Sequence, residues 1–191
     1  MQSKEKKYNI KIPNNILLIY HEKKNFLILK GPLKQKTLKL KLKIFINNSK
    51  KMINVSSVTF SKVSNIERKN IKILKNTTIA LIKQALIETS IIIHNKLTIN
   101  GVGYRVTFTE TFNNKLLTLK LGYSHVIYFK IPDNLKIDCL TKTKICVFGS
   151  SYKDISQISA LIRANKLPEP YKGKGILYEN EKINLKEGKK V

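Results

Sequence analysis

The most informative part of the sequence lies near its end and reads Leu161-Ile162-Arg163-Ala164-Asn165-Lys166-Leu167-Pro168-Glu169-Pro170-Tyr171-Lys172-Gly173-Lys174-Gly175. It begins as the last turn of an apolar-faced helix. Because proline disfavours helical geometry in the residue before it, we expect Pro168 to end that helix. Pro168 and Pro170 should then hold the backbone extended, which lowers the entropy lost on docking. The stretch therefore predicts a helix followed by a stiff arm.

The tip of this arm carries residues suited to bind a polyanion. Lys172 and Lys174 supply charge for phosphates, and Gly173 and Gly175 let the backbone approach a ligand closely. The ring of Tyr171 can stack on a base or a ribose. A Gly- and Lys-rich loop after a helix is also often only a solvated turn, so this stretch alone leaves both interpretations open.

The composition favours a nucleic-acid partner. The chain has 191 residues, and its 37 Lys+Arg against 12 Asp+Glu give a formal charge of +25. Self-repulsion on this scale destabilises a compact fold unless a polyanion neutralises it. An anionic membrane is the second candidate, but a membrane-binding protein concentrates its charge on one helix or tail. Here the lysines are spread along most of the sequence.

Other classes find less support. No apolar run approaches the length of a membrane span, and residues 1–7 lack the apolar core of a signal peptide. Cys139 and Cys146 do not make a disulfide framework and are expected to be small buried residues in a reducing compartment. The heavy use of Ile, Asn and Lys indicates AT-rich coding, which favours a protein made inside an organelle, most of all a mitochondrion.

The first half predicts strands followed by a helix. Residues 16–20 and 26–29 are short apolar strands, and residues 52–60 contain another. Leucine and isoleucine alternate with lysine over residues 38–46, which predicts one strand with one face in the core. The lysine row is either a solvated face or a phosphate-binding one.

The first helix is predicted over residues 77–93. Its capping side chains would come from Asn76-Thr77-Thr78, and Ile79, Ile82, Leu86 and Ile93 would fall on its inner face. The preceding polar and basic residues 61–75 predict no clear element.

The second half repeats the order of strands and then a helix. A second sheet begins at Leu97. Gly101-Val102-Gly103 lacks the third glycine of a dinucleotide loop and predicts a bulge or a close backbone approach. Strands follow over residues 104–108, 117–121, 126–131, 135–140 and 144–148.

The second helix should start at a capping box formed by Ser151 and Asp154, with Ile155, Ile158 and Ile162 facing inward. Together the two halves predict an α+β fold of two similar small domains, each a mostly antiparallel sheet with a packed helix, arisen by internal duplication. The predicted domains are residues 1–93 and 94–191, the second carrying the C-terminal arm.

Catalytic and metal chemistry find no pattern in the sequence. His21, His94 and His125 are far apart, and none stands at metal-ligand spacing from a cysteine. Ser124 and His125 are adjacent, so on a strand they would point to opposite faces and could not form a nucleophile-base pair. We therefore expect no enzyme, no metal and no cofactor. His125 is either a polar residue in a hairpin or a contact to an RNA edge or ribose.

Several separated motifs agree with one known family. The chain resembles the large-subunit ribosomal protein six family, in its bacterial and organellar form, and is similar to an organelle-encoded member. The motifs that carry the resemblance, in family order, are Gly101-Val102-Gly103-Tyr104-Arg105, Leu121-Gly122-Tyr123-Ser124-His125, Ala160-Leu161-Ile162-Arg163, Pro168-Glu169-Pro170-Tyr171-Lys172-Gly173-Lys174-Gly175 and Lys186-Glu187-Gly188-Lys189-Lys190. The chain departs from the family pattern at residues 61–75 and at Val126.

The resemblance implies two α+β domains and a structural role in the large ribosomal subunit. It implies binding to large-subunit rRNA near the sarcin–ricin loop and stalk base, beside neighbouring ribosomal proteins and translation factors, with no membrane and no small-molecule substrate. The AT-rich coding and the lack of a presequence favour the mitochondrial ribosome as the location, with a plastid or bacterial cytoplasm as alternatives. The RNA-binding residues carried over are Gly101, Gly103, Tyr104, Arg105, Tyr123, Ser124, His125, Arg163, Pro168, Glu169, Pro170, Tyr171, Lys172, Gly173, Lys174 and Gly175.

Two alternatives stay open at this point. Tyr104 can be a stacking platform or a part of the sheet core. The whole protein can also be a non-ribosomal organellar RNA-binding protein, which would be found away from ribosomes.

Overall fold

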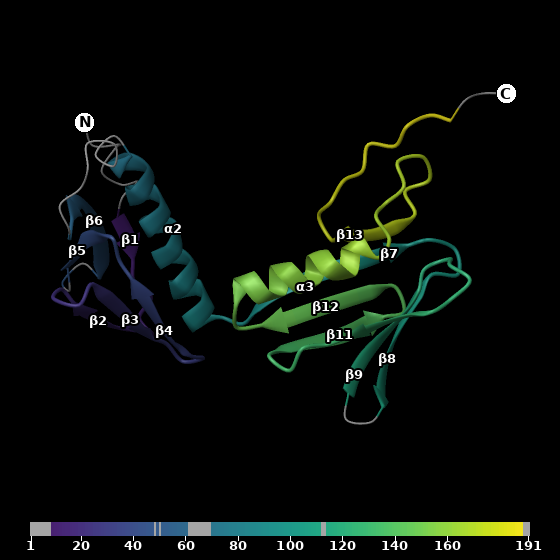
Figure 1. The fold of residues 1–191 in the computed structure, drawn as a ribbon, viewed down its shortest axis with the longest axis horizontal. Coiled ribbons are helices and arrows are strands. Elements are labelled where there is room, and N and C mark those ends of the chain that lie inside the picture. Colours follow the sequence, from purple (N-terminus) through teal and green to yellow (C-terminus); the bar gives the residue numbers. More distant parts are fainter. Residues whose placement is uncertain (1–8, 48, 50, 61–69, 112–113, 189–191) are drawn as a thin grey trace. The chain divides into compact units, whose positions relative to one another are not determined.

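The computed structural model describes residues 9–47, 49, 51–60, 70–111 and 114–188. The chain divides into two compact units, Met1–Ile91 and Ile92–Val191. Within the described residues, each unit combines antiparallel sheets with one long helix (Figure 1). The predicted α+β class is confirmed.

The described residues of unit 1 form two three-stranded sheets packed with one helix. The sheet of order β1-β6-β5 comprises β1 (Asn9–Lys11), β5 (Leu42–Asn47) and β6 (Met52–Thr59), and the sheet of order β2-β3-β4 comprises β2 (Leu17–His21), β3 (Phe26–Lys30) and β4 (Gln35–Lys39). Leu27, Leu29 and Ile53 are fully buried in the core that these strands share.

The single strand predicted over residues 38–46 is wrong. The chain forms two strands there, with β4 paired to β3 and β5 paired to β6. Between them the Leu40 backbone N–H donates to the Asn25 carbonyl at 2.8 Å. The alternating pattern correctly placed Leu40 and Leu42 in the core. It could not show the break, because the chain crosses between sheets while keeping the same face inward.

The helix predicted over residues 77–93 is α2 (Ile71–Ser90), so both predicted ends were wrong. Thr77 and Thr78 lie inside it, and their hydroxyls donate to the carbonyls of Leu74 and Lys75 at 2.9 and 2.8 Å. Such back-bonding occupies the hydroxyls that were expected to cap the helix. The N-cap position is Asn70, whose side chain makes no capping bond. The predicted residues 61–75 fall partly in α2, and residues 61–69 lie outside the described residues.

The C-terminal end of α2 also differs from the prediction. Ile79, Ile82 and Leu86 are buried as expected. Ile91 is already extended, with φ −134° and ψ 144°, and Ile93 begins a strand. The run of isoleucines over residues 91–93 explains this ending, because β-branched side chains favour strands over helices.

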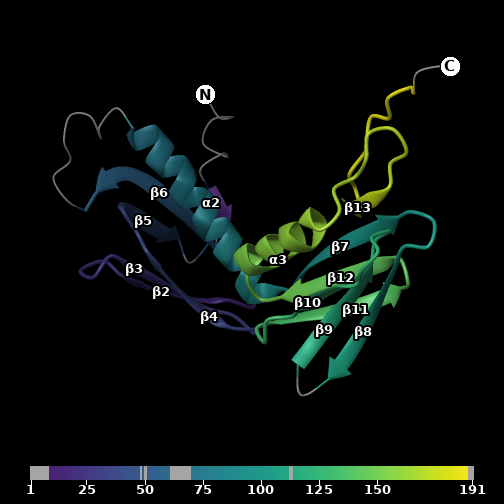
Figure 2. The ribbon, with the colours of Figure 1, turned by 45° about the vertical axis from the view of Figure 1, so that its right-hand side comes forward.

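Unit 2 is built on two sheets and the helix α3 (Tyr152–Ala164) (Figure 2). One sheet, of order β11-β12-β7-β13, comprises β7 (Ile93–Asn100), β11 (Leu135–Thr141), β12 (Lys144–Gly149) and β13 (Gly175–Tyr178); the other, of order β10-β9-β8, comprises β8 (Arg105–Thr111), β9 (Asn114–Lys120) and β10 (Ile127–Lys130). β7 therefore starts at Ile93, ahead of the predicted Leu97.

Helix α3 packs its apolar face on the sheet that contains β7, β12 and β13. Ile155 and Ile162 are fully buried, as predicted, and Ile158 packs partly buried against the same core. The predicted capping box does not form. Ser151 is the N-cap residue without a side-chain capping bond, while the Asp154 carboxylate accepts from the Asn134 amide at 3.1 Å. A competing partner from the loop before β11 therefore takes the carboxylate.

Helix α3 also ends before the predicted position. Its last residue is Ala164, and the Asn165 side-chain amide donates to the carbonyls of Leu161 and Ile162, both at 3.1 Å. These bonds satisfy two of the carbonyls that a helix leaves unpaired at its end. The helix is thus closed by Asn165 ahead of Pro168. Neither α2 nor α3 combines the length and the apolar character needed to cross a bilayer.

Candidate nucleic-acid interface

Three loops that carry the predicted site residues meet at one end of unit 2. We call them the glycine loop (residues 101–104, between β7 and β8), the histidine loop (residues 121–126, between β9 and β10) and the proline loop (residues 165–174, between α3 and β13). Gly175 pairs with Asn100 where β13 adds to β7, which returns the proline loop to the side of the glycine loop. The topology thus gathers residues that are far apart in the sequence.

Tyr104 joins the glycine and histidine loops. A Cβ atom added to Gly101 would lie 2.6 Å from the Tyr104 ring, and one added to Gly122 would lie 2.7 Å from it. Gly103 and Gly122 also have φ of 75° and 74°, where side chains are strained. At Gly101 the close approach is made by the Tyr104 ring and not by another stretch of backbone. The Tyr104 ring packs partly buried against the core of unit 2, as in the sheet-core alternative.

Tyr123 joins the histidine and proline loops. Its hydroxyl donates to the Asn165 carbonyl at 3.1 Å, and the Lys166 ammonium lies 4.3 Å from the centre of its ring. The His125 ring stacks on Tyr123 at 5.6 Å with an interplanar angle of 16°. Ser124 and His125 are exposed. These contacts hold the histidine loop against the end of α3 and leave its polar tip in solvent.

The proline loop is not the extended arm that the sequence predicted. The chain turns back over residues 170–172, where the Glu169 N–H donates to the Lys174 carbonyl and the Gly173 N–H to the Glu169 carbonyl, both at 2.9 Å. Proline's fixed φ suits the second position of a turn as well as an extended chain, so two prolines alone could not decide between them. The loop closes where a Cβ on Gly175 would lie 2.6 Å from the Pro168 Cα atom.

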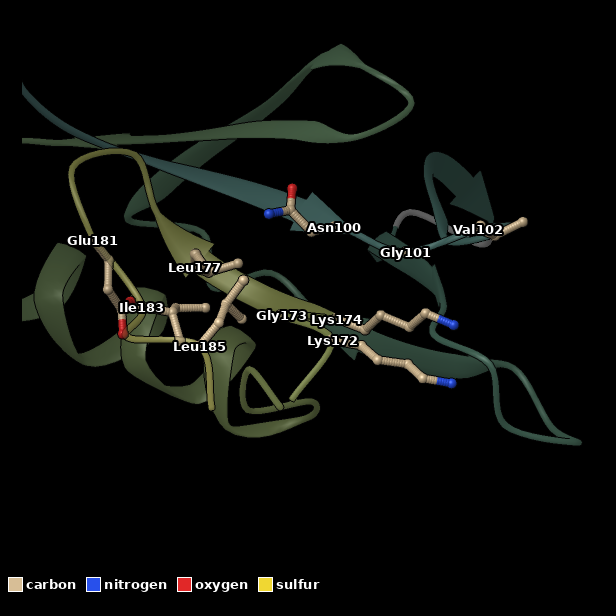
Figure 3. Close-up of a pocket in the computed structure, with 10 residues that line it drawn as sticks. All are labelled: Asn100, Gly101, Val102, Lys172, Gly173, Lys174, Leu177, Glu181, Ile183 and Leu185. Atoms are coloured by element: carbon tan, nitrogen blue, oxygen red, sulfur yellow. The ribbon is translucent and has the colours of Figure 1, made fainter. Parts of the chain in front are cut away.

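Lys172 and Lys174 lie at the edge of a hollow of about 550 Å³ beside the turned proline loop. Figure 3 shows their side chains running in the same direction, with Val102 of the glycine loop on that side and Glu181 toward the other end. Val102 is 91% exposed. Neither lysine forms an ion pair with any residue that the structure describes. The hollow therefore has two free cations on its rim.

Arg105 adds cationic charge at the start of β8. It lies directly across from Lys120 of β9 in the antiparallel register, so two cations oppose each other. Directly opposed like charges destabilise a strand pair. Neither side chain has an acidic partner in the described part of the chain. An external anion is the natural counter-charge for this pair.

Arg163 behaves differently from the other predicted cations. Its Nε atom donates to Glu181 Oε2 at 3.1 Å, and its Nη2 atom donates to Glu181 Oε1. This hydrogen bonding lowers the pKa of the Glu181 carboxyl below its ordinary value and raises the pKa of the Arg163 guanidinium. Arg163 therefore already has a carboxylate partner within unit 2.

The structure adds residues that the sequence reading missed. Lys166 and Lys120 join the cationic end of unit 2, and Glu181 pairs with Arg163. Only Lys120 had a readable signal, because the strand alternation around Leu119 and Leu121 puts it on the outward face. The contacts of Lys166 and Glu181 depend on where the chain after α3 folds.

The described residues give little support for metal binding or for a reactive cysteine. Among them, His, Cys, Asp and Glu form no cluster of three or more that could hold a metal ion. Cys146 is buried and Cys139 is half-buried, and both are free thiols. Burial raises the pKa of each thiol, which keeps it protonated and unreactive near neutral pH.

Comparison with known proteins gives one consistent answer. A family model described as "Ribosomal protein L6" matches residues 100–179, which include all three loops. A protein of Mycoplasmoides gallisepticum, named "Large ribosomal subunit protein uL6", is 38% identical over 180 residues, covering 94% of this chain and 92% of the relative. Relatives of the same name are 39% identical over 137 residues in Mesoplasma florum (72% of this chain, 74% of the relative) and 51% identical over 94 residues in Chlorobium limicola (49% and 50%).

Proposed function

Because the chain belongs to the ribosomal protein L6 (uL6) family, in its bacterial type, we propose that it is a structural constituent of the large ribosomal subunit that binds large-subunit rRNA through the three loops of unit 2. The protein is not an enzyme, in keeping with the structural role of this family. Its ribosomal partners are the rRNA and the neighbouring ribosomal proteins. No step of the proposal requires a cofactor or a small-molecule substrate.

The observation that carries the proposal is the gathering of unpaired cations where the three loops meet. Lys172, Lys174, Arg105 and Lys120 lack acidic partners in the described residues. Phosphates of a folded RNA would supply that missing charge, with release of counterions on binding. Arg105 can form a forked phosphate contact, whereas each lysine acts as a point charge.

The remaining loop residues would shape the contact with RNA. Tyr171 is 54% exposed on the proline loop and offers a ring for stacking on a base or ribose. Ser124 and His125 are exposed at the tip of the histidine loop, where they can donate to a ribose or a base edge. The positive-φ residues Gly101, Gly103 and Gly173 have no side chain, so RNA could approach their backbone closely.

We also propose a location on the ribosome. Following the family resemblance, the protein would lie near the sarcin–ricin loop and the stalk base, close to where translation factors dock. There it would support assembly of the last rRNA domain and the shape of the factor-binding site. Chemical footprinting of that rRNA, with and without the protein, would test this location.

The compartment is a further proposal. The Ile-, Asn- and Lys-rich composition supports a mitochondrial ribosome, while the bacterial relatives are equally compatible with a bacterial cytoplasm, and a plastid is the third candidate. Fractionation of purified organelles followed by immunodetection would decide among these locations.

Charge reversal at the hollow tests the function itself. The variant Lys172→Glu/Lys174→Glu should enter large subunits far less than the wild type, because it turns two phosphate contacts into repulsions, while the free protein stays folded. The matched control is Lys130→Glu/Lys136→Glu, which makes the same charge change on exposed residues of β10 and β11. The measurement is co-sedimentation of each protein with large subunits on a sucrose gradient.

Normal incorporation of the Lys172/Lys174 variant would show that the proline loop is not part of the rRNA interface. Equal loss in both double variants would indicate that only net charge matters. If the wild-type protein itself sediments away from ribosomes, the alternative of a free RNA-binding protein replaces the ribosomal proposal.

A further inference from the structure

The residues after β13 run back beside the proline loop, as both ribbon views show (Figures 1 and 2). We call residues 179–188 the C-terminal segment. This segment contacts the rest of unit 2 at two places, which we call fastenings: one near the end of α3 and one at the turn of the proline loop. The RNA contacts proposed above do not involve the residues of this segment.

The first fastening lies at the start of the segment. The Glu179 N–H donates to the Lys96 carbonyl at 3.1 Å, and the Lys96 ammonium lies 3.4 Å from the Glu179 carboxylate. Glu181 Oε2 accepts from the Tyr178 N–H at 3.2 Å in addition to its bonds from Arg163. The Glu181 carboxylate thus ties the segment both to helix α3 and to strand β13.

The second fastening lies at the turn of the proline loop. The Lys186 N–H donates to the Pro170 carbonyl at 2.9 Å. A Cβ atom on Gly173 would lie 3.4 Å from the Leu185 side chain, so this leucine packs beside the loop. Ile183 and Leu185 line the same hollow as Leu177 (Figure 3). On β13 the neighbouring Ile176 faces the core, yet the Leu177 side chain on the other face of the strand is only 4% exposed.

The pairing of Arg163 argues against a direct phosphate contact. The Arg163 and Glu181 side chains are 26% and 25% exposed, so they are partly screened from water. The Arg163 guanidinium also lies 5.7 Å from the ring centre of Tyr178. A phosphate approaching Arg163 would meet the negative charge of Glu181 beside it. The guanidinium therefore serves the fold of this end of unit 2.

We infer that the C-terminal segment is a strap that holds the proline loop in its turned shape, and that Arg163 and Glu181 fasten this strap as positioning residues without touching RNA. The inference rests on the proposed RNA-binding function and deepens it. A loop that is already ordered loses less conformational freedom when RNA binds, which raises affinity without any new contact.

The decisive variant is Glu181→Gln in the full-length chain. Its affinity for an rRNA fragment containing the sarcin–ricin loop should fall by about tenfold, the scale expected when a few ordered groups are freed. The salt dependence of binding should keep its wild-type slope, because no phosphate contact is lost. Glu187→Gln removes the same charge from the same segment at an exposed residue and controls for net charge.

The opposite outcome would overturn the inference. If Arg163 contacts phosphate and Glu181 only competes for it, Glu181→Gln frees the guanidinium. Binding then becomes tighter and its salt slope steeper by about one phosphate contact. The variants Arg163→Gln and Arg163→Gln/Glu181→Gln extend the test. Arg163→Gln and the double variant should each lose about as much affinity as Glu181→Gln, because the two side chains act as one unit.

A measurement on the free protein separates this inference from the RNA-binding proposal. Hydrogen exchange at the Gly173 and Lys186 amides should be faster in Glu181→Gln than in the wild type and unchanged in Glu187→Gln. Unchanged exchange in both variants would refute the strap whether or not RNA binds. If the wild type binds no RNA but exchange responds as expected, the proposed function fails and the strap remains a structural element. Should Glu181→Gln not fold, Leu185→Ala tests the other fastening by the same two measurements.

Discussion

Single residues at the end of unit 2 are constrained by backbone geometry as much as by exposed chemistry. Gly175 shows this most clearly, since it joins the proline loop to β13 at a φ of 149°. Added side-chain atoms there would meet main-chain atoms of Leu167 and Pro168, which cannot move aside as a flexible side chain could. The identity of this residue is therefore set by the path of its neighbours.

Gly175→Ala should destabilise unit 2 by about 2–3 kcal/mol, the cost of backbone strain together with a main-chain clash. Gly188→Ala is the matched control, because a Cβ atom there would meet nothing within 4 Å. Urea unfolding of both variants, followed by circular dichroism, measures the difference. Equal stability of the two variants would show that the loop relaxes without cost.

Glu181 makes the stability of unit 2 depend on pH. Its pKa in the folded state is lowered by the hydrogen bonds from Arg163, so folding favours the ionised carboxylate. The contribution is complete above the unfolded pKa of about 4.3. It is lost as the pH falls further toward the folded pKa, because the unfolded chain takes up the proton first.

Between about pH 5 and pH 3 the wild type should therefore lose more stability than Glu181→Gln, whose side chain does not titrate. The check is the midpoint of thermal unfolding of both proteins across this range, with Glu187→Gln as the control. Parallel pH profiles for wild type and Glu181→Gln would contradict the assigned pairing.

At the scale of elements, helix α2 depends on its packing more than on its ends. Its N-cap side chain makes no capping bond, its first turn has no acidic residue and its last turn no basic one. Local stabilisation by capping or by the helix dipole is therefore missing. The buried side chains of its inner face must supply most of its stability.

Ile82→Ala should cost unit 1 about 2–5 kcal/mol, because Ile82 is fully buried and its loss leaves a cavity. The neighbouring Leu81 is 53% exposed on the same helix, so Leu81→Ala should cost under about 1 kcal/mol. Denaturant unfolding of the two variants gives the comparison. Similar losses would mean that α2 is not anchored through its inner face.

At the scale of the whole molecule, charge is the dominant feature outside the two cores. The charge of +25 is spread over a chain in which the described residues form only a few ion pairs. In a free protein this surplus repels itself, and a bound polyanion relieves the repulsion. The charge therefore lowers the stability of the isolated protein and favours its bound state.

Raising NaCl from about 0.05 to about 0.5 M should raise the thermal unfolding midpoint of the free protein, because added salt shortens the screening length well below the spacing of distant charges. Glycerol at matched osmolality controls for effects unrelated to ionic screening. The Lys36 ammonium lies 2.6 Å from the buried Glu88 carboxylate in unit 1. A midpoint that falls with salt would show that this ion pair and the Arg163–Glu181 pair outweigh the general repulsion.

The sequence predicted elements well where a local pattern was sufficient. Short apolar runs located β2, β3 and β6 of unit 1 and β8 to β12 of unit 2, and helical spacing identified the buried faces of α2 and α3. It failed where the signal was not local. The break between β4 and β5 depends on the different strands with which the two pair. The start of α2 and the end of α3 depend on which hydrogen bond a hydroxyl or a side-chain amide forms.

The α+β class, the inner faces of α2 and α3, the cationic character of the molecule and the motifs that place it in its family could all be read from the residues in order. These follow from periodicity, composition and residue identity, which are properties of the chain alone. Three features depend on the folded chain: the proline loop turns back, Tyr104 is held between two glycine backbones, and Arg163 is paired with Glu181. Such contacts join residues far apart along the chain, and a local pattern carries no information about which distant group satisfies a charge or a hydrogen bond.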